Sequence, residues 1–254
     1  MWRLKQGNLL KMIDFHCHIL PGIDDGSQSM DESLELARQS VASGVTHVVA
    51  TPHGAMEDLE KMLAMRDAKL AELRERLAQE SIPLTLIPGL EYSVDGHSDD
   101  AALEYLNCRC GEKPGIASPL LVELKFSMNV SFAGNLLFKA QLKGIPVILA
   151  HAERYEGFKS GCSMLMELMD KGLVVQFNSQ NFSRPFPFFN SIPKVMLKLI
   201  AHAPENVIVG SDAHNPDMRP AGLDMARKIV TSEFGNDVWR KISWENPSRL
   251  LGLQ

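Results

Sequence analysis

The sequence MIDFHCH, residues 12–18, is a short apolar run that ends in two histidines separated by one residue. We interpret it as a β-strand, because a loop rich in turn-forming residues follows it directly. Side chains alternate along a strand, so His16 and His18 should point to one face while Phe15 and Cys17 point to the other. Two imidazoles on one face can bind a metal ion, although an isolated pair of this kind is as often two solvated or hydrogen-bonded histidines.

Six further apolar runs of strand length follow the first. They are expected at residues 47–51, 84–90, 120–126, 146–150, 173–178 and 207–211. Segments with helical spacing separate several of them, near residues 29–44, 57–79, 132–143 and 164–171, and a short helix near 101–106 lies inside a polar insertion over residues 93–119. Parallel strands need such covering crossovers. The sequence therefore predicts an α/β fold, a barrel-like domain of seven parallel strands over residues 12–254.

The composition is that of an ordinary globular protein, with 254 residues, 45% apolar and 22% charged. A net charge of -5 without a long basic run argues against nucleic acid or an anionic membrane surface as the main partner. There is no run of eighteen apolar residues, and residues 1–11 lack the features of a signal peptide, so we expect a cytoplasmic protein without membrane insertion. Residues 1–11 should form a flexible N-terminal extension, and Met12 is an alternative start.

Metal-binding residue types occur at or near the carboxyl ends of six of the seven predicted strands, the rim of a barrel where loops converge. The set comprises His16, His18, Asp24, Asp25, His53, Glu91, Glu123, His151, Asp212 and His214. Glu123 is the exception in placement, because it lies inside its apolar run. Imidazole and carboxylate without thiolate favour Mn, Fe or Zn. The set is too large for one ion, so we expect two or three divalent ions that share a bridging carboxylate, and hydrolysis by a metal-bound hydroxide.

The four cysteines do not fit a site in which a cysteine thiolate, instead of a metal-bound hydroxide, attacks a phosphate ester. A cysteine-dependent tyrosine phosphatase needs an arginine six residues after its cysteine, and the residues at that spacing here are Ile23, Pro114, Ile116 and Leu168. The cysteines are also too few and too scattered for a disulfide framework. Any phosphatase activity should therefore depend on metal.

Several of these motifs together resemble the polymerase-and-histidinol-phosphatase (PHP) superfamily. They are HCH at 16–18 with DDG at 24–26, TPH at 51–53, GLE at 89–91, ELKFS at 123–127, AHAERY at 150–155 and SDAH at 211–214. The last two, with Arg219 and Pro220, make the chain similar to the bacterial PHP-type tyrosine phosphatases encoded with capsule and exopolysaccharide genes, over residues 12–250. The resemblance implies a distorted seven-stranded barrel holding three ions, often manganese.

The resemblance also implies which residues hold each ion. The first ion would take His16, His18, Glu91 and Asp212, and the second Glu91, Glu123 and His151. The third would take His53, His214 and one of Asp24 and Asp25, a choice that stays open. Arg154 and Arg219 match the family's phosphate-contacting arginines, because a planar guanidinium suits phosphate oxygens, and surface salt bridges are their alternative role.

By this resemblance the protein is a manganese-dependent phosphatase acting on phosphotyrosine, with the tyrosine-rich tail of a polysaccharide-export kinase as its partner. Two alternatives stay open: a phosphatase of a small phosphomonoester such as histidinol phosphate, or a phosphodiesterase, and a non-catalytic binding module with bound metal. The phenylalanine-rich stretch at residues 181–193 is either a lid for an aromatic phosphoester or, as we favour, a packed loop or a contact in a homo-oligomer.

Overall fold

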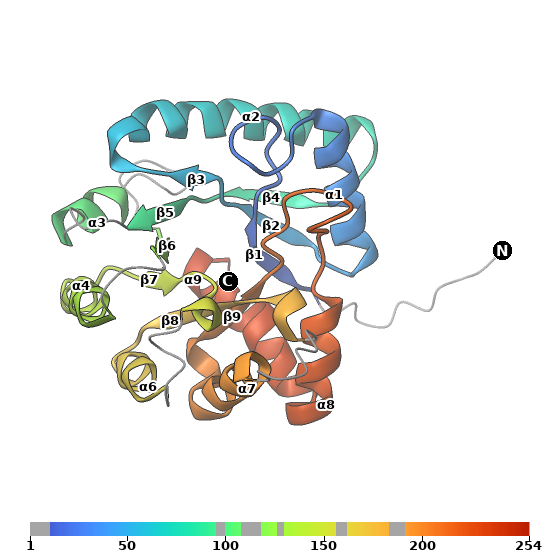
Figure 1. Ribbon diagram of the computed structural model, residues 1–254. Helices are drawn as coiled ribbons and strands as arrows, with labels where there is room; N and C mark the ends of the chain where they lie inside the picture. Colours follow the sequence, from blue (N-terminus) through green and yellow to red (C-terminus); the bar gives the residue numbers. More distant parts are fainter. Residues whose placement is uncertain are drawn as a thin grey trace.

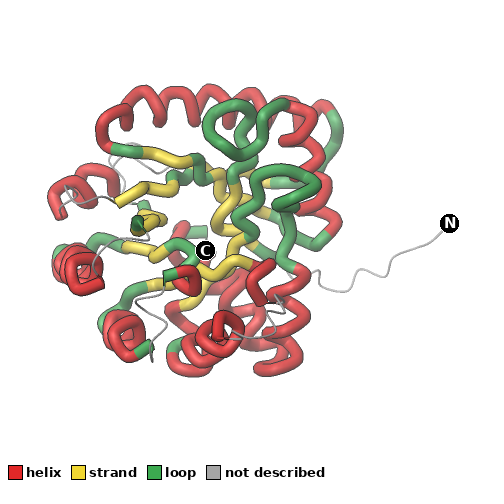
Figure 2. The backbone as a smooth tube through the Cα atoms, viewed as in Figure 1, coloured by secondary structure: helices red, strands yellow, loops and turns green. Residues whose placement is uncertain are grey.

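A computed structural model describes residues 11–94, 100–107, 118–125, 130–155, 162–182 and 191–253 of the chain. Strands occupy the middle of the molecule, and helices surround them (Figures 1 and 2). Within the described ranges, every strand pair is parallel. The predicted α/β fold with parallel pairing is therefore correct.

The strands form two sheets. One has the order β1-β2-β4, with β1 (Ile13–Cys17), β2 (His47–Ala50) and β4 (Thr85–Pro88). The other has the order β3-β5-β6-β7-β8-β9, with β3 (His53–Gly54), β5 (Glu91–Val94), β6 (Leu120–Leu124), β7 (Val147–Leu149), β8 (Val174–Asn178) and β9 (Val207–Gly210). In the described residues the two ladders do not close on each other, so the closed barrel of seven strands is not confirmed.

Just after the predicted strands 47–51 and 84–90, the chain forms a further strand in the second sheet, so each of these two strand positions is divided into two. Pro52 separates β2 from β3, since proline has no N–H to donate to a ladder. Gly89 separates β4 from β5 at a crowded point, where an added Cβ would lie 2.6 Å from Val49 Cγ1. The second halves carry His53 and Glu91, which are paired in register.

The α-helices in the described residues are α1 (Met30–Ala42), α2 (Leu59–Gln79), α3 (Asp100–Asn107), α4 (Val130–Leu142), α6 (Ser163–Asp170), α7 (Ser191–His202), α8 (Asp224–Arg240) and α9 (Asn246–Leu251). Ser29 caps the N-terminus of α1, because its Oγ accepts a hydrogen bond from the backbone N–H of Glu32. The sequence reading did not predict α7 as a helix of this length, nor α8 and α9.

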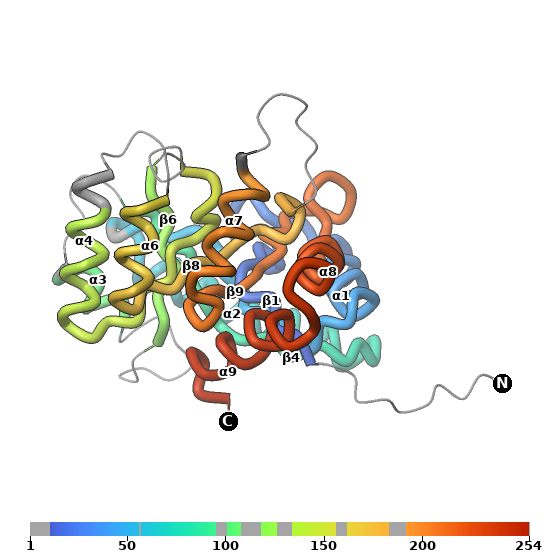
Figure 3. Tube along the Cα trace, turned by 90° about the horizontal axis from the view of Figure 1, so that it is seen from below, coloured from blue at the N-terminus to red at the C-terminus, as the bar shows by residue number. Residues whose placement is uncertain are grey.

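A small apolar cluster fills the amino-terminal part of the strands. Its members are Ile13, Phe15, Val49, Leu121, Ile148, Ala150, Val174 and Ile208. Trp244, Leu250 and Leu251 pack against the cluster, and Figure 3 shows α9 beneath the strands. The C-terminal segment therefore covers one end of the strands, and the rim at their carboxyl ends is left for the metal-type residues.

Strict alternation along β1 was a wrong expectation. Phe15 packs in this small cluster with Ile13, whereas Cys17 lies in the larger core around it. A register irregularity between Asp14 and Cys17 explains the change, because a bulge resets which side chains share a face. Cys17 is fully buried in the large core, so its thiol is not accessible to act as a nucleophile.

Three sequence predictions fall largely outside the described residues: the extension before residue 11, most of the insertion at 93–119, and the phenylalanine-rich stretch at 181–193. Among the helices that the structure does describe, none combines the length and hydropathy that a membrane span requires.

Candidate metal centre

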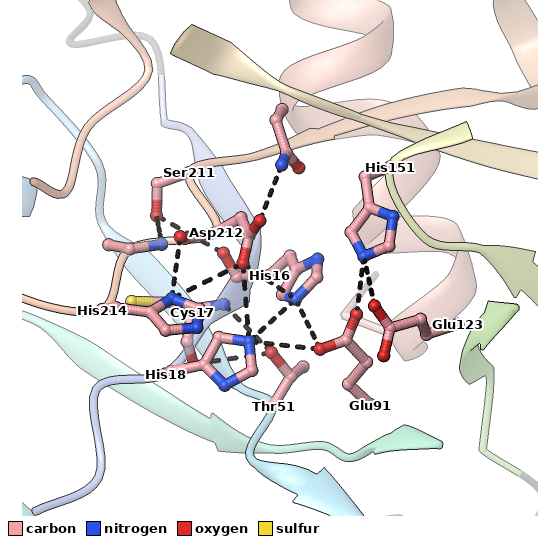
Figure 4. A network of polar contacts seen from close by, with 12 residues as sticks. His16, Cys17, His18, Thr51, Glu91, Glu123, His151, Ser211, Asp212 and His214 are labelled. Atoms are coloured by element: carbon pink, nitrogen blue, oxygen red, sulfur yellow. Dashed lines mark hydrogen bonds and ion pairs between the residues drawn. The ribbon is translucent and has the colours of Figure 1, made fainter. Parts of the chain in front are cut away.

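Four side chains from three parts of the chain point at one another beyond the carboxyl end of β1 (Figure 4). His16 Nε2 and His18 Nε2 are 3.1 Å apart, and each lies 3.2 Å from Glu91 Oε2. Each also lies 3.5 Å from Asp212 Oδ1. The four side chains are at most 5% exposed. Two imidazoles and two carboxylates thus present one atom each to a common, buried point.

Glu91 joins this group to a second one. Its Oε2 faces His16, His18 and, at 3.1 Å, His53 Nδ1, while its Oε1 lies 3.0 Å from His151 Nε2. His151 Nε2 is in turn 3.3 Å from Glu123 Oε1 (Figure 4). Glu123 reaches the site from within β6, where it pairs in register with Ser93. One carboxylate therefore serves two neighbouring clusters, which is the arrangement of a bridging metal ligand.

The buried oxygen of Glu91 shows that the residues fit metal ions. Among the described residues, Glu91 Oε2 has no hydrogen-bond donor of good geometry, although it is fully buried. Buried carboxylate oxygens nearly always have a partner, and a cation would supply one to an oxygen that faces three imidazole nitrogens.

A third group lies closer to solvent. Asp25 Oδ1 is 3.4 Å from His53 Nε2 and 3.5 Å from His214 Nε2, and its side chain is 68% exposed. These residues and His18 offer atoms close enough together to hold one ion. The described part of the chain thus brings nine of the ten predicted metal residues into three connected groups.

Asp24 is the tenth residue, and its oxygens are directed elsewhere. Asp24 Oδ2 accepts hydrogen bonds from His18 Nδ1 at 2.8 Å and from the backbone N–H of His53 at 3.0 Å. Its Oδ1 accepts from the backbone N–H of Gly26 at 2.9 Å. A carboxylate that binds the outer nitrogen of a histidine fixes the ring and leaves the other nitrogen for metal.

The charges of these groups are strongly interdependent. Burial opposes protonation of His18 and His151, but hydrogen bonds to carboxylates raise the pKa of His18 to about 10 and that of His151 to about 9. Burial also opposes ionisation of Glu91, yet the surrounding histidines hold its pKa well below the usual range. For His214, burial, His18 and Arg219 lower the pKa to about 4. Without metal, protons on His18 and His151 offset part of the negative charge of the neighbouring carboxylates.

Two arginines reach the same site from the outside. Arg219 Nη2 lies 2.6 Å and Arg154 Nη1 3.6 Å from Asp212 Oδ2, on the side of the carboxylate opposite to the first group. Their side chains are 36% and 37% exposed, so a ligand arriving from solvent can contact both guanidinium groups. Two guanidinium groups at the edge of a metal cluster suit a phosphoryl group.

The sequence reading missed residues that support the ligands. Tyr155 Oη is 3.3 Å from His151 Nδ1 and accepts the backbone N–H of Leu124 at 3.0 Å. Gln176 and Asn178 contact His16 and Asp212 from β8. Gln176 and Asn178 could have been noticed as polar residues within an otherwise apolar strand, because a buried polar side chain requires a hydrogen-bond partner.

A family model described as capsular polysaccharide synthesis, CpsB/CapC, matches residues 12–252. The chain belongs to this family. The resemblance inferred from the sequence motifs is thereby confirmed.

Two relatives of this CpsB/CapC chain are named tyrosine-protein phosphatases. It is 33% identical over 249 residues to the tyrosine-protein phosphatase YwqE of Bacillus subtilis, covering 96% of this chain and 92% of that protein. It is 30% identical over 254 residues to the tyrosine-protein phosphatase CpsB of Streptococcus pneumoniae, covering 94% and 98%.

Solved structures agree with these relatives. A crystal structure from work on YwqE of B. subtilis and CpsB of S. pneumoniae, described as unique metal-dependent tyrosine phosphatases, matches with a TM-score of 0.80. It is 31% identical in sequence, and the match covers 96% of this chain and 95% of that one. The phosphotriesterase homology protein of Escherichia coli matches with a TM-score of 0.60 at 13% identity, which shows a shared fold alone.

Proposed function

We propose that this CpsB/CapC chain is a metal-dependent protein-tyrosine phosphatase of capsule or exopolysaccharide synthesis. The observation that carries the proposal is Glu91, whose two oxygens serve two metal-type clusters beside a pair of accessible arginines. The named relatives are tyrosine-protein phosphatases that this chain matches over nearly their full length, and they support the same activity.

The proposed ions are three, with ligands divided as the geometry suggests. His16, His18, Glu91 and Asp212 would hold the first, and Glu91, Glu123 and His151 the second. Asp25, His53 and His214 would hold the third, since Asp24 already orients His18. Manganese is our proposed metal, with Fe or Zn as alternatives, because nitrogen and oxygen donors without thiolate suit all three.

The chain's own residues position the ester. When bound, the ions lower the pKa of water and offset the charge on the phosphoryl oxygens. Arg154 and Arg219 hold the outer phosphoryl oxygens, and Asp212 keeps both guanidinium groups in place before substrate arrives. A phenolate with a pKa near 10 leaves readily, so no dedicated acid is required. Water activated at the ions would be the nucleophile, so no covalent phosphoenzyme would be required.

We take the substrate to be phosphotyrosine on the tyrosine-rich tail of a polysaccharide-export kinase, in the cytoplasm. A reducing compartment agrees with Cys17 and Cys162, which are free thiols.

We also propose that residues 12–254 form one domain in which the two sheets complete a distorted barrel of seven strand positions. Hydrogen bonds across the open side support this. The N–H of Asp212 donates to His16 O at 2.7 Å, and the N–H of His18 donates to Ala213 O at 2.9 Å. The divided strands count as single positions, because each continues from one sheet into the other.

The test is hydrolysis of a phosphotyrosine peptide by metal-stripped protein refilled with Mn, Fe or Zn in turn. We expect Mn to restore activity and His151→Ala to abolish it. The matched control is His202→Ala, which removes a histidine paired with exposed Asp170 and should leave activity unchanged. Faster hydrolysis of histidinol phosphate or of a dinucleotide than of the peptide would overturn the proposed substrate. A peptide that stays phosphorylated with each of the three metals would overturn the proposed activity.

A further inference from the structure

Strand β8 carries two buried polar side chains that the proposed ligand set does not include. Gln176 is 0% and Asn178 6% exposed. They are two residues apart in β8, and the side-chain amide of Gln176 donates to Asn178 Oδ1 at 2.9 Å. A buried amide is costly unless both its oxygen and its nitrogen are hydrogen-bonded, so their partners reveal what they do.

A single backbone group sets the direction of the whole chain of hydrogen bonds. The N–H of His151 donates to Gln176 Oε1 at 2.8 Å, and a backbone N–H can only donate, so the oxygen of Gln176 must face it. The nitrogen of Gln176 then donates to Asn178 Oδ1. The nitrogen of Asn178 is left to donate to Asp212 Oδ2, at 2.7 Å. No other orientation of the two amides satisfies all three contacts.

This direction decides which tautomer the neutral ring of His16 adopts. Its Nδ1 lies 3.1 Å from Gln176 Oε1, which accepts only, so the hydrogen of the neutral imidazole is on Nδ1. The lone pair is then on Nε2, the atom that faces Glu91 and Asp212. A metal ligand needs this tautomer, and an acceptor on the outer nitrogen is the usual way to fix it.

The hydrogen bonds from His151 through Gln176 and Asn178 to Asp212 form a relay, and its Asn178 end decides the orientation of Asp212. Asn178 and Arg219 both bind Oδ2, which leaves Oδ1 directed at His16 and His18. The surroundings leave little room for rearrangement, because a Cβ on Gly210 would lie 3.0 Å from Gln176 Nε2 and 2.6 Å from His16 Cβ. The relay therefore ends on two ligands of the first ion and on the backbone of a ligand of the second.

From these contacts we infer that Gln176 and Asn178 are positioning residues that aim His16 Nε2 and Asp212 Oδ1 at the first ion and tie that ion's ligands to His151. The inference rests on the proposed metal centre. It assigns the two amides no contact with substrate. Their effect should appear in metal affinity, even when no substrate is present.

The test compares variants for manganese binding by titration against a chelator and for bound manganese per chain by mass spectrometry. In Gln176→Leu we expect the affinity of the first ion to fall about 10- to 100-fold, the usual effect of removing an outer partner of a ligand. Gln176→Glu keeps an acceptor for His16 and His151 but loses the donor to Asn178, so its affinity should lie between wild type and Gln176→Leu. Asn178→Ala should weaken the same ion by releasing Asp212.

The matched control is Gln141→Leu on α4, which removes hydrogen bonds to Leu168 O and Lys171 O away from the centre. It should lower the melting temperature of the metal-free protein without changing manganese affinity. A Gln176→Leu or, if that chain does not fold, a Gln176→Glu protein that binds manganese as tightly as wild type overturns the inference. Wild-type protein that binds none of Mn, Fe and Zn overturns the proposed function instead, so the two failures are distinguishable.

Discussion

Arg219 Nη2 lies 2.6 Å from Asp212 Oδ2, while the other oxygen of Asp212 faces the two histidines of β1. One carboxylate thus connects the side of the centre that we propose holds phosphate to the side that we propose holds metal. A change at either residue should be felt on the other side.

Arg219→Lys tests the phosphate-holding side. Lysine keeps the charge but loses the two-pronged donor, so we expect kcat/KM for a phosphotyrosine peptide to fall about 10- to 100-fold, as for one charged hydrogen bond of roughly 1.5–3 kcal/mol. The control is Arg38→Lys on α1, whose guanidinium binds Glu35 and Glu80 at the surface. Equal kcat/KM in Arg219→Lys and wild type would contradict the assigned role.

The two neighbouring aspartates should give different defects. Asp25→Asn should lose one manganese per chain without lowering the melting temperature of the metal-free protein, because its side chain is largely exposed. Asp24→Asn should lower that melting temperature, because Asp24 Oδ2 accepts from both His18 and the backbone of His53. Mass spectrometry of bound metal and calorimetry separate the two. Retention of three ions by Asp25→Asn would show that the third ion is not held there.

The metal-free protein should lose stability as pH rises. The folded-state pKa values of about 10 for His18 and about 9 for His151 lie above the ordinary value of 6.5. Their contribution is therefore complete below about pH 6.5 and is lost as pH rises through 9 to 10. Metal needs the unprotonated rings, so manganese affinity should rise over the same interval. Calorimetry of metal-free protein at pH 7 and pH 10 measures this, and a smaller fall in His151→Gln is the control. A melting temperature that does not fall by pH 10 would contradict it.

Gly26 should not tolerate a side chain. An added Cβ would lie 2.3 Å from His18 O and 2.9 Å from Asp24 Oδ1. Gly26→Ala should therefore destabilise the protein by about 1–3 kcal/mol and weaken metal binding through His18. Gly134→Ala is the matched control within helix α4, where alanine is the better helix former and the nearest atom of the described residues is Met164 Sδ, at 3.4 Å. Urea unfolding of both variants gives the comparison, and equal midpoints would refute the argument.

Much of the fold was predictable from hydrophobic runs, because most of the buried strands are short, mainly apolar segments of the chain. The divisions at Pro52 and Gly89 were not, since an apolar run does not reveal where a strand passes from one sheet to another. The prediction that Phe15 and Cys17 share one face was wrong for a related reason. The irregularity in β1 depends on its pairing with β2, which the sequence of β1 alone does not show.

The ligand residues were predictable as residue types at strand ends, but their separate roles were not. Asp24 and Asp25 are adjacent and chemically identical, and only the loop geometry directs one to His18 and the other to His53 and His214. Gln176 was overlooked because a lone amide in a strand has no motif of its own. Its importance depends on residues 25 and 160 positions away in the chain.

The packing of Trp244, Leu250 and Leu251 beneath the strands has a consequence for turnover. Because apolar side chains fill that end, we expect ester, water and released phosphate to exchange through the rim where Arg154 and Arg219 lie. Product would then leave past the groups proposed to hold it as part of the substrate. Inorganic phosphate should consequently compete with the phosphotyrosine peptide, so the enzyme would slow as free phosphate accumulates around it.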